Sequence, residues 1–284
     1  MYKRRLVLSA HFDECPVEEQ IRLFAKVGFE GFFTGWQPGA PVARWRKTAD
    51  ECGMLYQSVH GPFRGCAEIW KEDSESAENF VQELKDCVRD CADNGVALMI
   101  SHAFIGFYTG MKPTEIGLER FGRVIREAER RGVKIAFENT EGEEFLAAVL
   151  NAFGESPNVG FCWDTGHEMC YNGRKDMTAL YGQYLLGTHL NDNLGARSYD
   201  GVITWHDDLH LLPYDGIGDW AGIAARLDKA GFPGPLTFEL NRTSKPDRHE
   251  NDAYGRVSLE EYVTAAYMRA CRVAALTGRP GTEC

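Results

Sequence analysis

Nine ionisable side chains stand at or shortly after the ends of short apolar runs in this sequence. Five of them are histidines, out of eight in the chain, and the other four are carboxylates. Gathered at one place, the carboxylates would repel one another strongly unless cations neutralised them. These residue types therefore predict a divalent metal site if the fold brings them together. The nine residues are His60, His102, Glu138, Asp164, His167, His189, Asp208, His210 and Glu239.

A mixed set of imidazole and carboxylate ligands favours Zn²⁺ or Mn²⁺, and it leaves Mg²⁺, Co²⁺ and Fe²⁺ open as alternatives. Taken singly, each residue also has an ordinary structural interpretation. A histidine at a strand end often hydrogen-bonds a backbone carbonyl, and an aspartate there often caps the next helix. The remaining histidines, His11, His206 and His249, lie in loops or beside other polar residues, and we expect them to be solvated.

Short apolar or β-branched runs alternate with segments of helical spacing along the chain, as a parallel sheet with crossover helices requires. Several predicted helices end at a glycine that precedes the next run, which suits the left-handed position at a helix C-terminus. The predicted strands are Leu6–Ser9, Phe29–Thr34, Leu55–His60, Ala97–His102, Lys134–Asn139, Val159–Asp164, Leu185–Leu190 and Pro235–Leu240. The clearest predicted helices are Ser76–Asn94, Pro113–Arg131, Glu143–Phe153, Asp219–Ala230 and a C-terminal helix that opens with the capping box Ser258–Glu261.

The predicted fold class is α/β, a single TIM (β/α)8 barrel that spans residues 1–284 as one domain. A barrel of this kind typically needs ~250 residues. The sequence contains neither the Gly-x-Gly-x-x-Gly turn of a dinucleotide-binding open sheet nor a Pro/Ser-rich linker between domains. TIM barrels build their active sites at the carboxyl ends of their strands. We therefore expect the nine side chains to gather at one rim of the barrel.

Composition and charge exclude several classes of function. The net charge of −11 would repel the phosphates of nucleic acid or of an anionic membrane, so neither is an expected partner. No apolar stretch approaches the ~20 residues that span a bilayer, and the first residues lack the apolar core of a signal peptide. The nine cysteines are expected to be reduced thiols, with Cys87 and Cys91 buried as structural residues. We expect a cytoplasmic protein.

Several motifs together resemble the xylose isomerase-like TIM-barrel superfamily over nearly the whole chain. This superfamily contains sugar-phosphate isomerases and epimerases, ketose 3-epimerases, inosose dehydratases and the endonuclease IV repair enzymes. The motifs are Phe137-Glu138-Asn139-Thr140, Trp163-Asp164-Thr165-Gly166-His167, His189-Leu190-Asn191-Asp192, Asp208-Leu209-His210 followed by Asp215-Gly216-Ile217-Gly218-Asp219-Trp220, and Phe238-Glu239.

The resemblance implies two alternative metal sites. In the sugar-acting branch it implies one divalent metal, with the other rim residues facing the substrate. In the endonuclease IV branch all nine positions hold three zinc ions, and all nine match here, so ligand identity leaves both branches open. The single-metal ligands would be Glu138, Asp164, His189 and Glu239, and the substrate-binding residues would be His60, His102, His167, Asp208 and His210.

The likeness of the Asp208–Pro213 segment favours the sugar-acting branch, and with it an isomerase or epimerase of a sugar or sugar phosphate. In this hypothesis the metal stabilises an enediolate intermediate. Glu138 and Glu239 lie on opposite sides of the rim, and one removes the α-carbon proton while the other returns it. An inosose dehydratase-like lyase would use the same intermediate, and an endonuclease IV-like phosphodiesterase acting at abasic sites is the other alternative. The resemblance also permits a homo-oligomer.

Tryptophans and basic residues near the predicted mouth add to this hypothesis. Trp36 and Trp205 are predicted to pack on the C–H face of a sugar, or else to cover the rim. Arg44, Arg46, Lys47 and Arg64 form a modest basic group that suits a helix surface, one sugar phosphate or DNA. A metal-binding sugar sensor would keep the ligands without an acid/base pair, and a structural zinc site would be rich in cysteine, unlike this set.

Overall fold

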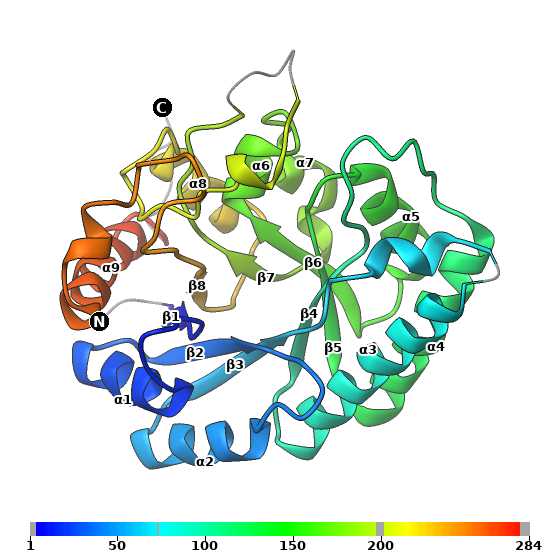
Figure 1. Cartoon of the computed structure of the whole chain (residues 1–284), viewed down its shortest axis with the longest axis horizontal. Coiled ribbons are helices and arrows are strands. Elements are labelled where there is room, and N and C mark those ends of the chain that lie inside the picture. The colour runs from blue at the N-terminus through cyan, green and yellow to red at the C-terminus, as the bar shows by residue number, and fades with distance from the viewer. Residues whose placement is uncertain (1–3, 73, 197–201, 279–284) are drawn as a thin grey trace.

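Eight short strands and the helices between them curl into a parallel barrel in the computed structural model, which describes residues 4–72, 74–196 and 202–278 (Figure 1). The strands neighbour one another in the order β7-β6-β5-β4-β3-β2-β1-β8. β7 and β8 meet through a single parallel bridge between Leu190 and Phe238, which nearly closes the ring. The structure thus confirms the predicted TIM barrel.

All eight predicted strands are present, and their boundaries differ by a few residues. The prediction for β8 ran too far, since only Leu236–Phe238 of the predicted run pairs with β1. The strands are β1 (Leu6–Ser9), β2 (Gly31–Gly35), β3 (Leu55–His60), β4 (Leu98–His102), β5 (Lys134–Glu138), β6 (Val159–Asp164), β7 (Leu185–His189) and β8 (Leu236–Phe238).

The helices surround the barrel, and the five that the sequence predicts bury apolar residues against it. Gly132 ends α4 in the left-handed conformation (φ 70°), as predicted for a helix that stops directly before a strand. The helices are α1 (Val17–Val27), α2 (Val42–Cys52), α3 (Glu75–Asp93), α4 (Glu115–Arg131), α5 (Glu143–Phe153), α6 (Thr165–Cys170), α7 (Met177–Tyr181), α8 (Trp220–Lys229) and α9 (Leu259–Ala274), and short 3-10 turns are η1 (Cys66–Trp70), η2 (Gly182–Tyr184), η3 (Trp205–Asp207) and η4 (Tyr254–Arg256).

The main core lies between the outer faces of the strands and the helix layer. A smaller apolar cluster of Leu98, Ile100, Ala136 and Cys162 comes from β4, β5 and β6. Cys87 and Cys91 are fully buried on α3, which confirms their predicted burial. α9 packs against α1 and α8 beside the junction of β1 and β8, so the two ends of the described chain meet (Figure 1).

In the described residues, no helix combines the length and the apolar character that crossing a bilayer needs.

Candidate metal centre

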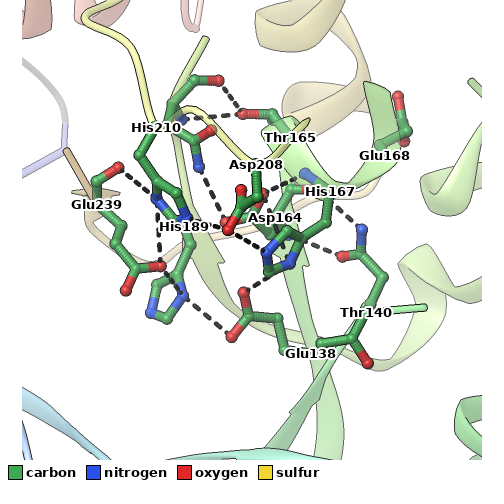
Figure 2. A network of polar contacts seen from close by, with 12 residues as sticks. Glu138, Thr140, Asp164, Thr165, His167, Glu168, His189, Asp208, His210 and Glu239 are labelled. Carbon is green, nitrogen blue, oxygen red and sulfur yellow. Dashed lines mark hydrogen bonds and ion pairs between the residues drawn. The ribbon is translucent and has the colours of Figure 1, made fainter. Parts of the chain in front are cut away.

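Five consecutive strands each end in a residue that can bind a metal. The last residues of β3 to β7 are, in order, His60, His102, Glu138, Asp164 and His189. Parallel strands of a barrel end at one rim, so this spacing brings residues from distant parts of the chain side by side. Of the remaining candidates, Glu239 follows β8, His167 lies on the helix after β6, and Asp208 and His210 lie in the loop between β7 and α8. Figure 2 shows how they point toward one another.

The nine side chains form three ligand groups, two of which share Glu138, and within each group the candidate ligand atoms lie within 4.8 Å of one another. The central group is Glu138, Asp164, His189 and Glu239. The first flanking group is His60, His102 and Glu138, and the second is His167, Asp208 and His210. A fourth combination replaces two carboxylates of the central group with Cys162. The structure therefore brings together all nine predicted site residues.

In the central group, two carboxylates approach the same imidazole nitrogen. His189 Nδ1 lies 3.2 Å from Glu138 Oε2 and 3.0 Å from Glu239 Oε2 (Figure 2). Glu138 is almost completely buried, whereas Glu239 keeps 20% of its side chain exposed. The His189 ring is held flat against Phe33, with ring centroids 4.8 Å apart. Carboxylates from the end of β5 and from just after β8 thus meet at one imidazole nitrogen.

In the first flanking group, hydrogen bonding fixes how His60 presents its lone pair. His60 Nδ1 donates to the Gly61 carbonyl at 2.9 Å, so Nε2 of the neutral ring carries no proton. That atom faces His102 Nε2 at 3.1 Å and Glu138 Oε2 at 3.5 Å. His102 Nε2 in turn lies 3.3 Å from Glu138 Oε2. Two imidazole nitrogens and one carboxylate oxygen therefore converge on a common point.

The second flanking group has the same character. His210 Nδ1 donates to the backbone carbonyl of Glu239 at 3.1 Å, while His210 Nε2 lies 2.9 Å from Asp208 Oδ2. His167 Nε2 reaches the same Asp208 oxygen at 3.5 Å. Since Nδ1 carries its own proton, a second proton or a metal ion must lie between His210 Nε2 and the carboxylate.

Several buried polar atoms of these groups have no hydrogen-bond partner, although charged groups lie close by. Such atoms are costly to bury unless a cation or water completes their coordination. They occur in all three groups, and their number and their convergence fit bound divalent metal ions. The atoms are His102 Nδ1, Glu138 Oε1, His167 Nδ1, His189 Nδ1 and Nε2, and Asp208 Oδ1.

The closely spaced charges of the site shift the pKa values of its residues. Burial, reinforced by the neighbouring Glu138 carboxylate, raises the pKa of Asp164 to about 7. Burial alone would lower the pKa of His189, but the carboxylates of Glu138 and Glu239 outweigh it and raise that pKa well above its usual value. Burial also opposes charge on His210, and Asp208 outweighs it to raise the pKa to about 9. Buried carboxylates thus depend on adjacent positive charge.

Hydrogen bonds from two asparagines, Asn139 and Asn191, orient Asp164. Asn139 Oδ1 accepts from the Asp164 amide at 2.8 Å, and Asn139 Nδ2 donates to the Asp164 carbonyl at 2.9 Å. Asn191 Nδ2 donates to Asp164 Oδ2 at 2.9 Å. Asp164 also caps α6 by accepting from the His167 amide at 2.6 Å, so the structural interpretation and the ligand interpretation of this aspartate hold together.

Asp192 fixes the loop that carries Asp208 and His210. Its carboxylate accepts hydrogen bonds from the Tyr214 amide at 2.9 Å, the Gly218 amide at 2.8 Å and Trp220 Nε1 at 2.8 Å. Its backbone also pairs with Leu211 in an antiparallel bridge. The loop between β7 and α8 is therefore attached to the rim at several points.

The three groups face a cavity of about 480 Å³, a size typical of small-molecule sites. Trp205 lies on η3 at its edge with half of its side chain exposed, and the Lys245 ammonium stands 5.4 Å above its ring. Trp205 is thus where the sequence predicts it. The cavity is lined by Phe63, Arg64, Ile105, Phe107, Thr140, Glu141, Tyr171, Trp205 and Lys245 together with His60, His102, Glu138, His167, Asp208, His210 and Glu239.

Trp36 does not line this cavity, so its predicted contact with substrate is corrected. Its indole is buried in the core, and Nε1 donates to Asp90 of α3 at 2.6 Å. An indole that reaches outward from the end of β2 to the helix layer supports the barrel and cannot also cover its mouth.

The three remaining histidines lie outside the ligand groups of the described residues, as expected. His249 keeps 85% of its side chain exposed, and His11, also exposed, contacts Asn241 Oδ1 at 3.0 Å. His206 is half-buried against the Trp205 ring. Of the predicted basic group, Arg64 lines the cavity, whereas Arg44 pairs with a glutamate on α1.

Sequence reasoning did not identify several cavity residues, namely Phe63, Ile105, Phe107, Glu141, Tyr171 and Lys245. They lie in loops between strands and helices or directly after the short helix α6. Tyr171 stacks on His167 with ring centroids 4.9 Å apart, so it forms part of the wall beside the second flanking group. An aromatic residue in a loop has no periodic pattern that reveals which way it faces.

Comparisons with known proteins agree with this architecture. The chain is 33% identical over 154 residues to the uncharacterized protein y4fM of Sinorhizobium fredii, an alignment that covers 49% of this chain and 45% of that protein, so the chain matches about half the length of this relative. The fold is similar to D-psicose 3-epimerase crystallised in the presence of D-fructose (14% identity, TM-score 0.70, 95% of this chain and 99% of that chain). It is also similar to an IolI protein with a bound zinc atom (15% identity, TM-score 0.72, 95% and 98%).

At these low identities the solved structures establish the fold alone. The family assignment rests on a sequence model described as xylose isomerase-like TIM barrel, which matches residues 21–259. This match covers most of the chain and includes all nine rim positions. The chain therefore belongs to the xylose isomerase-like TIM barrel family.

Proposed function

We propose that this protein is a metal-dependent isomerase or epimerase of a sugar or sugar phosphate that works by proton transfer. The observation that carries the proposal is the position of Glu138 and Glu239, which both line the 480 Å³ cavity and approach His189 Nδ1 at 3.2 Å and 3.0 Å. Removal and return of a proton at one substrate carbon require two such acid/base groups. Relatives of the same fold named as sugar epimerases support the substrate class.

The residues of the central group fit one divalent ion, for which Zn²⁺ and Mn²⁺ are the leading candidates. When bound by Glu138, Asp164, His189 and Glu239, it would supply Lewis-acid stabilisation of negative charge on the substrate oxygens.

Side chains around the cavity would transfer the proton, bind the substrate and exclude water. Glu239, the more exposed of the two glutamates, faces the cavity and is positioned to take the proton from the carbon beside the carbonyl. Glu138, enclosed by its neighbours, is positioned to return a proton from another side. His167 and the Asp208–His210 pair would hold substrate hydroxyl groups, while Trp205 shields the reacting carbon from bulk water.

Deuterium uptake tests this proposal directly. The protein is purified without chelator, supplied with Zn²⁺ or Mn²⁺ and incubated with D-fructose or D-fructose 6-phosphate in D₂O, and proton NMR follows the α-carbon positions. Metal-dependent exchange is expected, and Glu239→Gln should abolish it while circular dichroism stays unchanged. Glu119→Gln, an exposed change on α4, is the matched control. Exchange by Glu239→Gln at the wild-type rate would exclude the two-carboxylate mechanism, and loss of water from the substrate would identify a dehydratase.

One observation favours a second candidate function, a zinc-dependent phosphodiesterase acting at abasic sites in DNA. All nine rim residues fall into three ligand groups, as they would in a site for three metal ions. The net charge of −11 opposes a nucleic-acid substrate. Elemental analysis together with cleavage of an abasic-site duplex separates the two: about one metal ion per chain without cleavage supports the sugar enzyme, whereas three zinc ions with rapid cleavage supports the phosphodiesterase.

A cytoplasmic location, a single-domain organisation and a possible homo-oligomer stay predictions from the sequence.

A further inference from the structure

We call the 480 Å³ cavity at the ligand groups the active-site cavity. A second cavity, of about 280 Å³, adjoins it, and we call this one the outer cavity. It is formed by the loop between β4 and α4, by the start of α5 and by Ile203. Phe107, Glu141 and Tyr171 line both cavities, so the two spaces meet at these three side chains. None of the three is among the candidate metal ligands.

Aromatic rings lead from the metal centre into the outer cavity. The Tyr171 ring stacks on His167 at 4.9 Å, and Phe107 meets the edge of Tyr171 at 5.4 Å with an interplanar angle of 66°. Phe104 and Phe145, stacked at 4.0 Å, form the base of the outer cavity. A ligand in the active-site cavity therefore has an aromatic surface beside it on which a further group can lie.

The backbone of the β4–α4 loop holds an exposed tyrosine at this place. Tyr108 adopts φ 55°, a left-handed conformation that non-glycine residues seldom adopt, and 67% of its surface is exposed. Its hydroxyl accepts a hydrogen bond from the Ile203 amide across the outer cavity. Strained backbone of this kind persists where surrounding contacts enforce it, and it is frequent at ligand sites.

Charged groups stand beside these rings. Glu141 Oε1 accepts from the Gly106 amide at 2.7 Å, and the Lys112 ammonium lies 3.2 Å from Glu144 at the other side of the outer cavity. A sugar ring has an apolar C–H face and a rim of hydroxyl groups, so it matches a surface that combines aromatic faces with carboxylate and ammonium groups. A purely apolar group would leave the polar edge of the outer cavity without a complementary hydroxyl group.

We propose that the outer cavity binds a second sugar ring that is glycosidically linked to the ring reacting at the metal centre. The substrate is then a glycoside of disaccharide size. This inference rests on the proposed function, which it makes more specific by assigning a place to the linked sugar. Phe107 and Tyr108 provide the stacking surfaces, and Glu141, Glu144 and Lys112 receive the hydroxyl groups.

Calorimetric titration of the zinc-loaded protein tests the inference. The probes are D-fructose, its glucosides turanose, leucrose and palatinose, which carry glucose at different positions, and 6-O-benzyl-D-fructose. At least one glucoside should bind about tenfold more tightly than D-fructose, the gain expected from one good stacking surface. Tyr108→Ala, which changes a residue that lines only the outer cavity, should remove this gain without changing the Kd of D-fructose. Phe63→Ala, which removes an aromatic ring that lines only the active-site cavity, should weaken fructose and glucoside alike.

The outcomes separate the inference from the proposed function. Equal Kd values for D-fructose and every glucoside would overturn the second sugar site while leaving the isomerase proposal in place. Tighter binding of the benzyl compound alone would overturn the assignment to a sugar and identify an aromatic substituent. If no probe binds, the inference fails, and the deuterium-uptake experiment then decides separately whether the proposed function fails with it.

Discussion

Asn191 at the end of β7 donates a hydrogen bond from Nδ2 to Asp164 Oδ2, 2.9 Å away at the end of β6. The contact is possible because Gly166, on the first turn of α6, leaves room for the amide. A Cβ at position 166 would lie 1.9 Å from Asn191 Oδ1. The glycine therefore allows one strand end to fix a carboxylate that belongs to its neighbour.

Gly166→Ala should displace Asn191 and release the Asp164 carboxylate. Because partners of metal ligands typically contribute tenfold to hundredfold to metal affinity, Zn²⁺ binding should weaken by about that factor. Equilibrium dialysis with Zn²⁺ measures the change. Gly182→Ala is the matched control, because there the nearest atom to an added Cβ is 3.6 Å away. Equal Zn²⁺ affinity in Gly166→Ala and the wild type would show that the hydrogen bond does not support a metal site.

Asp192→Ala should loosen the loop that carries Asp208 and His210. The change removes the acceptor for three backbone amides, those of Asn193, Tyr214 and Gly218, and for the Trp220 indole, all buried or part-buried. Leaving such donors unpaired costs about 3 kcal/mol or more of the free energy of unfolding. Urea denaturation measures this loss, and hydrogen exchange of the Gly218 amide should accelerate. Asp219→Ala is the control in the same loop, since it removes only the exposed N-cap of α8 and should cost about 1 kcal/mol. Similar losses for both variants would contradict this role.

The strand ends could be predicted from the sequence because a single pattern determines them. An apolar run of strand length that stops at an ionisable residue places that residue at the rim, whichever helices surround the barrel. For this reason the sequence correctly predicts that His60, His102 and Glu138, at the ends of β3, β4 and β5, lie close together. The predicted extension of β8 to Leu240 failed because the same apolar pattern continues after pairing with β1 has ended.

The orientation of side chains outside the strands could not be predicted in this way. Trp36 follows β2 in the sequence just as a cavity residue would, and only the Asp90 carboxylate on α3 shows that its indole faces the helix layer. Phe107 and Tyr171 meet across the β4–α4 loop and the end of α6, a contact between segments with no periodic signal. Such positions depend on tertiary contacts between distant residues, which local patterns do not encode.

Removal of metal should destabilise the protein. The ligand atoms of the central group, three carboxylates and one imidazole, lie within 4.8 Å of one another. Without a divalent cation, only bound protons can offset the repulsion between the carboxylates. A ligand present at a hundred times its Kd stabilises by about 2.7 kcal/mol, which corresponds to roughly 5–10 °C in Tm for a chain of this size. Differential scanning calorimetry before and after treatment with a chelator measures the shift, and added Zn²⁺ should reverse it.

Two histidine variants make this prediction specific to the site. His189→Ala should lower the bound metal per chain and should remove most of the response of Tm to Zn²⁺. His249→Ala, which changes an exposed histidine outside the ligand groups, should behave as the wild type does. A Tm that is the same with and without Zn²⁺ in the wild-type protein would argue against a metal centre at this rim.

Glu127 on α4 should contribute to stability in a way that disappears in acid. Hydrogen bonding from Arg131 at 2.7 Å, helped by Arg130 and Arg89 against a smaller effect of burial, lowers the pKa of Glu127 to about 2. A free glutamate in the unfolded chain titrates near ~4.3. The folded state therefore binds this proton less readily, so the stabilisation is complete above about pH 5 and is lost as the pH falls from there toward 2.

Glu127→Gln should consequently lower the free energy of unfolding by about 2 kcal/mol at pH 7, the size typical of hydrogen bonds to a charged group. The difference from wild type should shrink steadily between pH 5 and pH 2 in urea titrations at each pH. Glu119→Gln serves as the control on the same helix, because that carboxylate is exposed and lies 3.7 Å from Arg123. Its effect should stay small at every pH, since exposed pairs contribute little. If the loss of unfolding free energy in Glu127→Gln were the same at pH 2 as at pH 7, the stabilisation would come from packing and not from the charge on the carboxylate.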